Sequence, residues 1–185
     1  MKEISSAKLS KSGTSRNMTS GLLLAIALVT TCIAFAQDEN NLKFKGGIGV
    51  VPVTGVAANG AVNLNIVRGV SPGGPWRIAA LEAEVTSDGR IKVEGRGLLL
   101  ASGNGIGTNA GQTVHATLFC GPAATATAHD SIGVPLEADG DFRIDGLLSP
   151  APPSICETPV LLIRNAGGVW FAAGIPKSEE ERRGN

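Results

Sequence analysis

The sequence predicts an all-β protein, an antiparallel β-sandwich of immunoglobulin-like character with about eight or nine strands and one disulfide. Three observations support this fold class. Glycine and proline supply 25 and 10 of the 185 residues, so the chain turns often. Short apolar runs alternate with polar residues at a period of two, as strands do. After residue 36, no ten-residue stretch keeps a helical apolar period without a glycine or proline. A closed barrel is the alternative architecture, and the sequence barely separates the two.

The first expected strand covers residues 42–53, and a second follows from the alternation of Val62, Leu64 and Ile66 with polar or smaller neighbours. Residues 78–86 and 90–100 flank a Ser-Asp-Gly segment at 87–89. Because an Asp-Gly pair tolerates the positive φ angles of a tight turn, these two runs predict a hairpin.

Residues 113–120 form the next expected strand. A second hairpin is expected at Asp139 and Gly140, where 132–137 would pair with 142–148, and a third at 165–168, where 158–164 would pair with 169–175. The connections are too short for parallel crossovers, so the strands should pair antiparallel. The bulky residues expected between the layers are Trp76, Trp170, Phe119, Phe142 and Phe171.

The N-terminal 36 residues have the three parts of a secretory signal. Four basic residues and one acid precede an apolar run that starts at Gly21, and Ala34-Phe35-Ala36 forms a cleavage site. The run from 21 to 36 is 16 residues long, below the roughly 20 needed to span a bilayer. We expect cleavage after Ala36, which places the protein in the periplasm or outside the cell.

This expectation divides the chain into a signal peptide at 1–36, a disordered start at 37–41, one sandwich domain at 42–176 and a disordered charged tail at 177–185. Cleavage removes four basic residues and one acid, which leaves 12 basic and 15 acidic residues and a net charge of −3. A mildly acidic chain without a basic stripe argues against nucleic acid as a partner.

Cleavage also removes Cys32 and leaves Cys120 and Cys156. Two cysteines in an oxidising compartment most economically form one disulfide. Neither lies in a C-x-x-C motif or beside a basic cluster that would indicate a reactive thiol. We therefore expect a structural bridge between Cys120 and Cys156.

The longest glycine-rich loop, 103–111, is the first candidate for a ligand contact, through Asn104, Ile106, Thr108 and Asn109. Its glycines do not indicate a phosphate cradle, because a strand and not a helix follows them. Loops on a rigid scaffold are where binding groups gather.

No catalytic residue, metal site or cofactor is expected. His115 and His129 supply two imidazoles, and a catalytic zinc usually takes three protein ligands. The consecutive residues His129, Asp130 and Ser131 cannot form a triad, since neighbouring side chains on an extended chain point apart.

Two acidic clusters leave alternatives open. Glu137, Asp139, Asp141 and Asp145 crowd one hairpin without the spacing of a calcium loop. Glu82, Glu84 and Glu94 on the other hairpin have the charge, and no further sign, of a paired-carboxylate hydrolase site.

Three segments, 68–76, 114–120 and 168–172, together with the signal peptide, resemble a group of exported bacterial proteins of unknown function. The resemblance implies export and transfers no catalytic residue. The leading expectation is a secreted or cell-envelope binding or structural module without catalysis, whose partner is a protein or polysaccharide of the cell envelope. The alternatives are a carboxylate-based hydrolase acting on polysaccharide and an exported copper-handling protein that uses His115 and His129.

Overall fold

The computed structural model describes residues 41–52, 55–56, 62–63 and 65–177. They belong to one compact unit, Asn40–Asn185. The predicted signal peptide at 1–36, most of the two ends predicted to be disordered, and Leu64 lie outside the described residues. Thirteen strands form: β1 (Leu42–Gly49), β2 (Gly55–Val56), β3 (Val62–Asn63), β4 (Trp76–Arg77), β5 (Ala80–Val85), β6 (Arg90–Arg96), β7 (Leu99–Leu100), β8 (Thr113–Cys120), β9 (Thr127–Asp130), β10 (Val134–Pro135), β11 (Phe142–Leu147), β12 (Val160–Asn165) and β13 (Trp170–Pro176).

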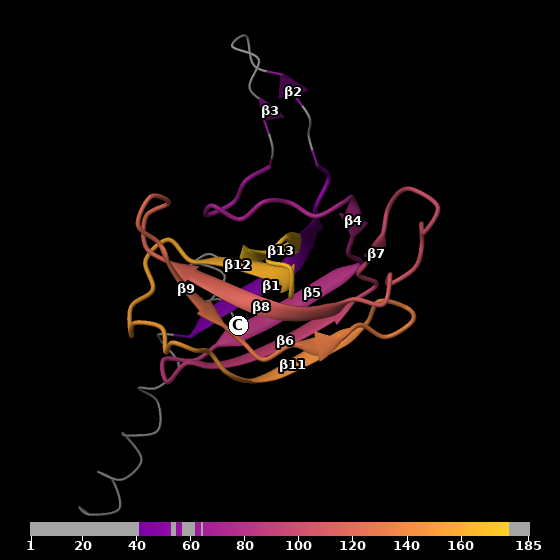
Figure 1. Cartoon of the computed structure of the whole chain (residues 1–185). Coiled ribbons are helices and arrows are strands. Elements are labelled where there is room, and N and C mark those ends of the chain that lie inside the picture. Colours follow the sequence, from indigo (N-terminus) through magenta and orange to yellow (C-terminus); the bar gives the residue numbers. More distant parts are fainter. Residues whose placement is uncertain (1–40, 53–54, 57–61, 64, 178–185) are drawn as a thin grey trace, which may run out of the picture. The chain divides into compact units, whose positions relative to one another are not determined.

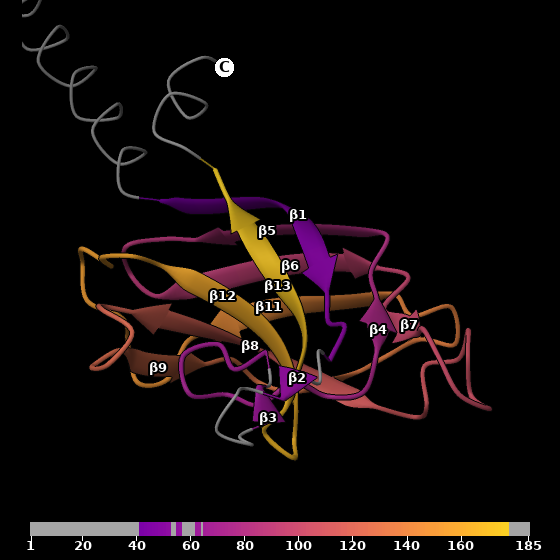
Figure 2. The ribbon, with the colours of Figure 1, turned by 90° about the horizontal axis from the view of Figure 1, so that it is seen from above.

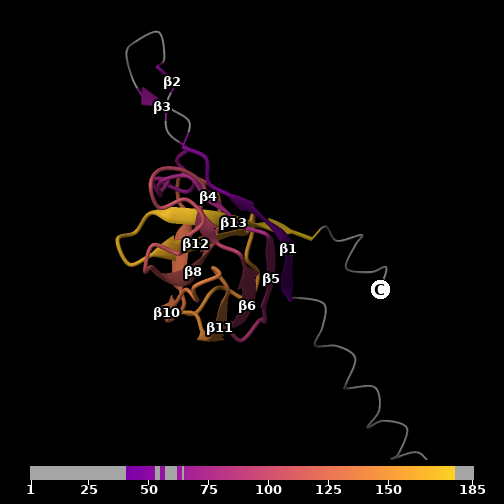
Figure 3. The ribbon, with the colours of Figure 1, turned by 90° about the vertical axis from the view of Figure 1, so that its right-hand side faces the viewer.

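Nine of these strands belong to one antiparallel sheet in the order β10-β8-β12-β13-β1-β5-β6-β11 (Figures 1, 2 and 3). The ninth, β9, pairs with β8 on the same side as β10 but further along the strand. The strands form where the sequence alternates. In β6, Ile91 and Val93 are buried while Arg90, Lys92 and Glu94 are exposed. This period of two gives the sheet one apolar and one wet face.

The sheet curls so that its two halves face each other across the core (Figure 3). Asp130 in β9 and Ser149, just after β11, form an antiparallel bridge with hydrogen bonds of 2.9 and 2.8 Å. This bridge links β9 to the far end of the sheet. The two ends of the sheet, seven places apart in the strand order, are thereby held together by backbone hydrogen bonds.

The core lies between the two halves. Leu81, Ile91 and Ile144 from one half and Leu118 and Leu161 from the other are fully buried. Apolar burial of this kind is the main stabilising term of the fold. The core also contains all six aromatic side chains of the described residues: Phe44, Trp76, Phe119, Phe142, Trp170 and Phe171.

Two aromatic contacts show how the core is completed. Trp76 stacks on Phe171 with ring centroids 4.2 Å apart. Phe142 lies directly opposite Gly95, and a Cβ atom at Gly95 would come within 2.0 Å of the Phe142 ring. The position therefore needs glycine for a packing reason, and not for backbone freedom.

The predicted fold class is confirmed in its main terms: the described chain is all-β and antiparallel, has a nine-stranded sheet and one disulfide, and has a packing consistent with a β-sandwich. The immunoglobulin-like strand order stays a prediction. The hairpins of β5 with β6 and of β12 with β13 are confirmed, and Gly89 at the first turn has φ 83°.

The second predicted hairpin is confirmed at its turn, but its two strands, β10 and β11, have their main partners elsewhere in the sheet. A tight turn does form at Asp139 and Gly140, where Gly140 N donates to Glu137 O at 2.9 Å. However, β10 pairs with β8 and β11 pairs with β6. A turn signal specifies a local reversal, while the neighbours of each strand depend on the curl of the whole sheet.

The disulfide between Cys120 and Cys156 is confirmed, with Cα atoms 4.9 Å apart. It joins the end of β8 to the proline-rich segment that precedes β12. The chain around it is also tied by hydrogen bonds: Gly121 N donates to Glu157 O at 2.7 Å, and Thr158 Oγ1 donates to Gly121 O at 2.7 Å. The bridge therefore fixes the entry of the chain into β12.

Candidate functional site

A shallow groove of about 340 Å³ lies on the outer face of β1, β5 and β6. Strand register aligns the charged residues of this face in two rows that cross the sheet. The first row is Lys43, Glu84, Lys92 and Asp145. The second row is Lys45, Glu82, Glu94 and Arg143. Each residue is directly opposite the next on the neighbouring strand, so the rows are fixed by backbone pairing.

Ion pairs join part of each row. Lys43 Nζ lies 4.0 Å from Glu84 Oε1, and Arg143 contacts Glu94. All of these side chains are substantially exposed to solvent, so each pair contributes little to stability. The charged rows therefore contribute little to the stability of the fold, and a role as a binding surface explains them better.

The groove gathers every lysine that the described residues contain: Lys43, Lys45, Lys92 and Lys177. Three come from β1 and β6, and Lys177 follows β13, where its backbone nitrogen donates to Lys43 O at 2.8 Å. Among described residues, the ammonium groups of Lys45, Lys92 and Lys177 have no ion-pair partner. The groove thus presents cations that are free to meet a ligand.

The carboxylates considered for a hydrolase are brought together in this groove. Glu82 and Glu94 face each other across β5 and β6, and Glu84 lies two pairs further along, on the same face of the sheet. Both Glu82 and Glu94 are exposed, whereas the general acid of a glycosidase is usually held in an apolar setting. The arrangement supplies two neighbouring carboxylates without the burial that such an acid needs.

The residues of the glycine-rich loop divide into two groups. Asn109 and Thr108 hold the loop: Asn109 Nδ2 donates to Leu136 O and Glu137 O at 3.0 Å, and Thr108 Oγ1 donates to Gly105 O at 2.7 Å. Asn104 and Ile106 are exposed, Ile106 to 64%. A contact role for these four residues stays a prediction.

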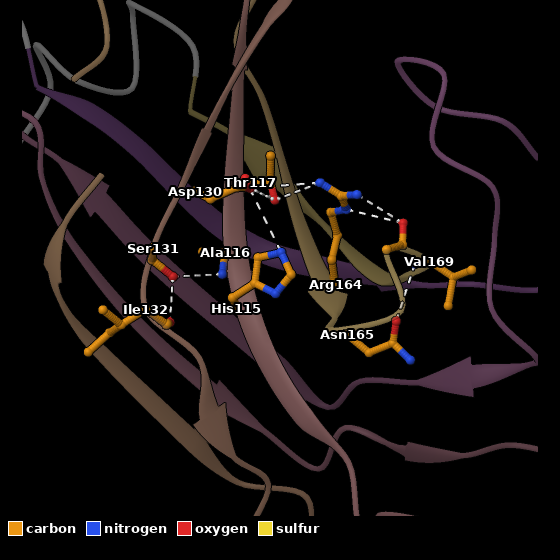
Figure 4. Close-up of polar contacts among 10 residues, drawn as sticks. His115, Ala116, Thr117, Asp130, Ser131, Ile132, Arg164, Asn165 and Val169 are labelled. Atoms are coloured by element: carbon orange, nitrogen blue, oxygen red, sulfur yellow. Dashed lines mark hydrogen bonds and ion pairs between the residues drawn. The ribbon is translucent and has the colours of Figure 1, made fainter. Parts of the chain in front are cut away.

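A second polar cluster surrounds Asp130 on the other half of the sheet (Figure 4). Asp130 Oδ1 accepts a hydrogen bond from the buried hydroxyl of Thr117 at 2.6 Å, and it lies 3.8 Å from both His115 Nε2 and Arg164 Nη1. Arg164 also donates to Gly168 O through Nε and Nη2, at 3.3 and 3.0 Å. Its guanidinium is therefore committed to holding the turn between β12 and β13.

His115 titrates in this cluster. Partial burial lowers the pKa of His115 below its ordinary value, and the nearby Arg164 charge acts in the same direction, while the Asp130 carboxylate opposes both. The neutral imidazole is thus favoured.

His129 lies on β9, is buried, and points to the opposite side of the sheet from His115. It faces Leu118 in the register, whereas His115 shares its side with Thr117. His129 Nδ1 donates to Pro150 O at 2.8 Å, and Thr127 Oγ1 lies 3.0 Å from Nε2. These contacts give His129 a local structural role.

The acidic hairpin is likewise used internally. Asp139 Oδ1 accepts from Asp141 N at 3.0 Å, Asp141 Oδ1 accepts from Gly97 N at 2.9 Å, and Asp145 pairs with Arg90 at 3.5 Å. Within residues 41–177, as far as they are described, no three His, Cys, Asp or Glu side chains cluster as metal ligands would.

Sequence reasoning missed the lysine groove. The signal was present, since charged residues occupy alternate positions of residues 43–45, 82–84 and 92–94. Finding the groove required the knowledge that these segments are neighbours. The pairing of β1 with β5 joins segments almost forty residues apart, and Lys177 enters only because β13 lies beside β1.

In the described part of the chain, no helix is both long and apolar enough to cross a bilayer. Comparison with known proteins finds no matching family model, no similar curated protein and no similar solved structure.

Proposed function

We propose that the protein is exported to the cell envelope or beyond, and acts there as a non-catalytic binding module whose ligand surface is the lysine groove. The observation that carries the proposal is the gathering of all four described lysines in one groove on a rigid sheet. The strands that carry the groove are each paired on both sides. Their backbones are therefore fixed before a ligand arrives, which lowers the entropic cost of binding.

Two features support export. The N-terminal sequence has the organisation of a secretory signal, and the predicted start of the mature chain is Gln37. The Cys120–Cys156 disulfide supports the same compartment, because such bridges persist in oxidising environments. The test is to express the full chain in a bacterial host and fractionate the cells. We expect a product that begins at Gln37 in the periplasm or medium; an intact chain in the cytoplasm would contradict export.

A polysaccharide-cleaving hydrolase is the second candidate, since Glu82 and Glu94 are direct neighbours in the groove. The exposure of both carboxylates favours binding over catalysis. The copper-handling alternative has no comparable support, because His115 and His129 lie on opposite sides of the sheet.

The binding proposal is tested with the full chain and a panel of envelope fractions and immobilised polysaccharides. We expect retention on at least one of them, lost when Lys45→Glu and Lys92→Glu are combined, with no release of reducing ends. Retention that is unchanged in this variant would place the binding surface elsewhere. Release of reducing ends that stops in Glu82→Gln and in Glu94→Gln would favour the hydrolase.

A further inference from the structure

We propose that the lysine groove binds a carboxylated polysaccharide, a polymer that carries many hydroxyl groups and regularly spaced carboxylates. This inference rests on the proposed function and names its ligand class. Five observations support it: the charge of the face, its mixture of lysine and glutamate, the pairing of its strands, the location of the aromatic residues, and the shape of the face.

The charge of the described residues is unevenly distributed. They include ten basic and ten acidic residues. Seven of the basic ones lie on the outer face of β1, β5, β6 and β11 or line its groove: Lys43, Lys45, Arg90, Lys92, Arg96, Arg143 and Lys177. Four acids, Glu82, Glu84, Glu94 and Asp145, share this face. The face is therefore net positive on a domain that is neutral as a whole, which favours an anionic ligand.

The glutamates indicate what kind of anion fits. Glu82, Glu84 and Glu94 lie among the lysines of the groove, where they would repel a densely charged phosphate backbone. They can instead accept hydrogen bonds from hydroxyl groups, since an ionised carboxylate is an acceptor only. Lysine ammonium groups donate to both carboxylates and hydroxyls. A ligand that has hydroxyls as well as carboxylates meets both kinds of side chain.

The strand pairing argues against a peptide ligand. Strand addition requires a free sheet edge, and helix or polyproline docking requires apolar anchors in a groove or pocket. β1, β5 and β6 are each paired on both sides. Of the residues that line the groove, the two apolar ones, Phe44 and Ala83, are buried, and the others are charged. A peptide that binds by strand addition or by apolar anchors therefore does not fit this surface.

The aromatic residues argue for charge as the source of affinity. Neutral sugars commonly stack on exposed rings, but Trp76 and Trp170 are 4% and 5% exposed, and the four described phenylalanines are also buried. No ring in the described structure is free to stack on a sugar. The groove must therefore use ion pairs, and binding should weaken steeply as salt is added.

The shape of the face fits a chain in preference to a single sugar. A second hollow of about 160 Å³ shares Glu84 and Lys92 with the groove and extends to Arg90. Together they run across β1, β5 and β6. A polymer can contact successive charged rows, so several weak contacts add up along its length.

The test is affinity electrophoresis of the full-length protein in gels that contain sodium polygalacturonate or neutral dextran. We expect polygalacturonate, and not dextran, to retard the protein. This retardation should be lost at about 0.5 M salt, because that ionic strength screens the attraction between exposed lysines and the carboxylates of the polymer. Combining Lys45→Gln with Lys92→Gln should weaken binding about tenfold, as expected for the loss of two exposed charge contacts. Lys92→Arg should bind like the wild type.

The control is Arg77→Gln, which removes a positive charge from an exposed residue of β4 outside the groove. It should change the affinity by less than about twofold, within the range expected of a distant surface charge. Thermal unfolding of the lysine variants should match that of the wild type, because both side chains are exposed.

Other results would overturn the ligand class. Equal retardation by dextran, with the lysine variants still defective, would leave the groove as a binding site for a different ligand. Binding to a DNA duplex or to phosphatidylglycerol vesicles without binding to polygalacturonate would assign it to phosphates. Wild-type binding of polygalacturonate by the double lysine variant would remove the groove from the interaction, and the proposed function would fail with it.

Discussion

Breaking the Cys120–Cys156 disulfide should destabilise the protein by about 4 kcal/mol, the loop-closure value for a cross-link that spans 36 residues. The closed loop contains β9, β10 and β11. Reduction therefore increases the conformational entropy of this whole segment in the unfolded chain. Cys120 is 4% exposed, and a serine hydroxyl there adds the cost of an unpaired polar group. Cys156→Ser is therefore the cleaner single variant.

The assay is urea unfolding of the full chain carrying Cys32→Ser, so that Cys120 and Cys156 are the sole cysteines. Oxidised protein should contain no titratable thiol. Cys156→Ser and the reduced parent should show the same loss, within the roughly 0.5 kcal/mol expected for equivalent perturbations. A loss below about 1 kcal/mol would refute the loop-closure argument, as would two reactive thiols in the oxidised protein.

Two further predictions concern packing and titration. Gly95→Ala should destabilise the fold by about 1 to 3 kcal/mol through overpacking against Phe142. Gly74 has open space around it, so the control Gly74→Ala should change the stability by no more than about 0.5 kcal/mol. Equal unfolding midpoints for the two variants would contradict the Phe142 contact. The folded-state pKa of His115 lies below the ordinary value of 6.5. The stability that the neutral imidazole contributes is therefore fully present above pH 6.5 and is lost as the pH falls through the folded-state pKa. Urea unfolding between pH 7 and pH 5 should show a shallower decline for His115→Gln, and identical slopes would exclude His115 as the source.

The sequence predicts local structure well where it repeats a simple pattern. The β5–β6 hairpin combines strict alternation with an Asp-Gly turn, and β8 covers the residues expected of it, Thr113–Cys120. β9 was missed because Thr127–Asp130 is short and rich in small residues, so it has a weak strand signal. Its position is decided by backbone bonds to β8 and to Ser149.

The pairing of strands that lie far apart in the chain could not be predicted from the sequence. The turn at Asp139 predicted a hairpin, yet its two strands, β10 and β11, pair mainly with β8 and β6 and so lie at opposite ends of the sheet order. The groove depends on the same kind of information. Lys45 and Glu82 are opposite each other only because β1 inserts between β5 and β13, and no local pattern specifies that insertion.

The most direct measurement of the binding surface is a titration of isotope-labelled full-length protein with a polygalacturonate oligosaccharide, followed by amide NMR. We expect the perturbed amides to cluster at Lys43–Lys45, Glu82–Glu84, Lys92–Glu94 and Lys177, which share one groove, with little change at 103–111. Perturbations concentrated in the loop around Asn104 and Ile106, with the groove amides unmoved, would contradict it.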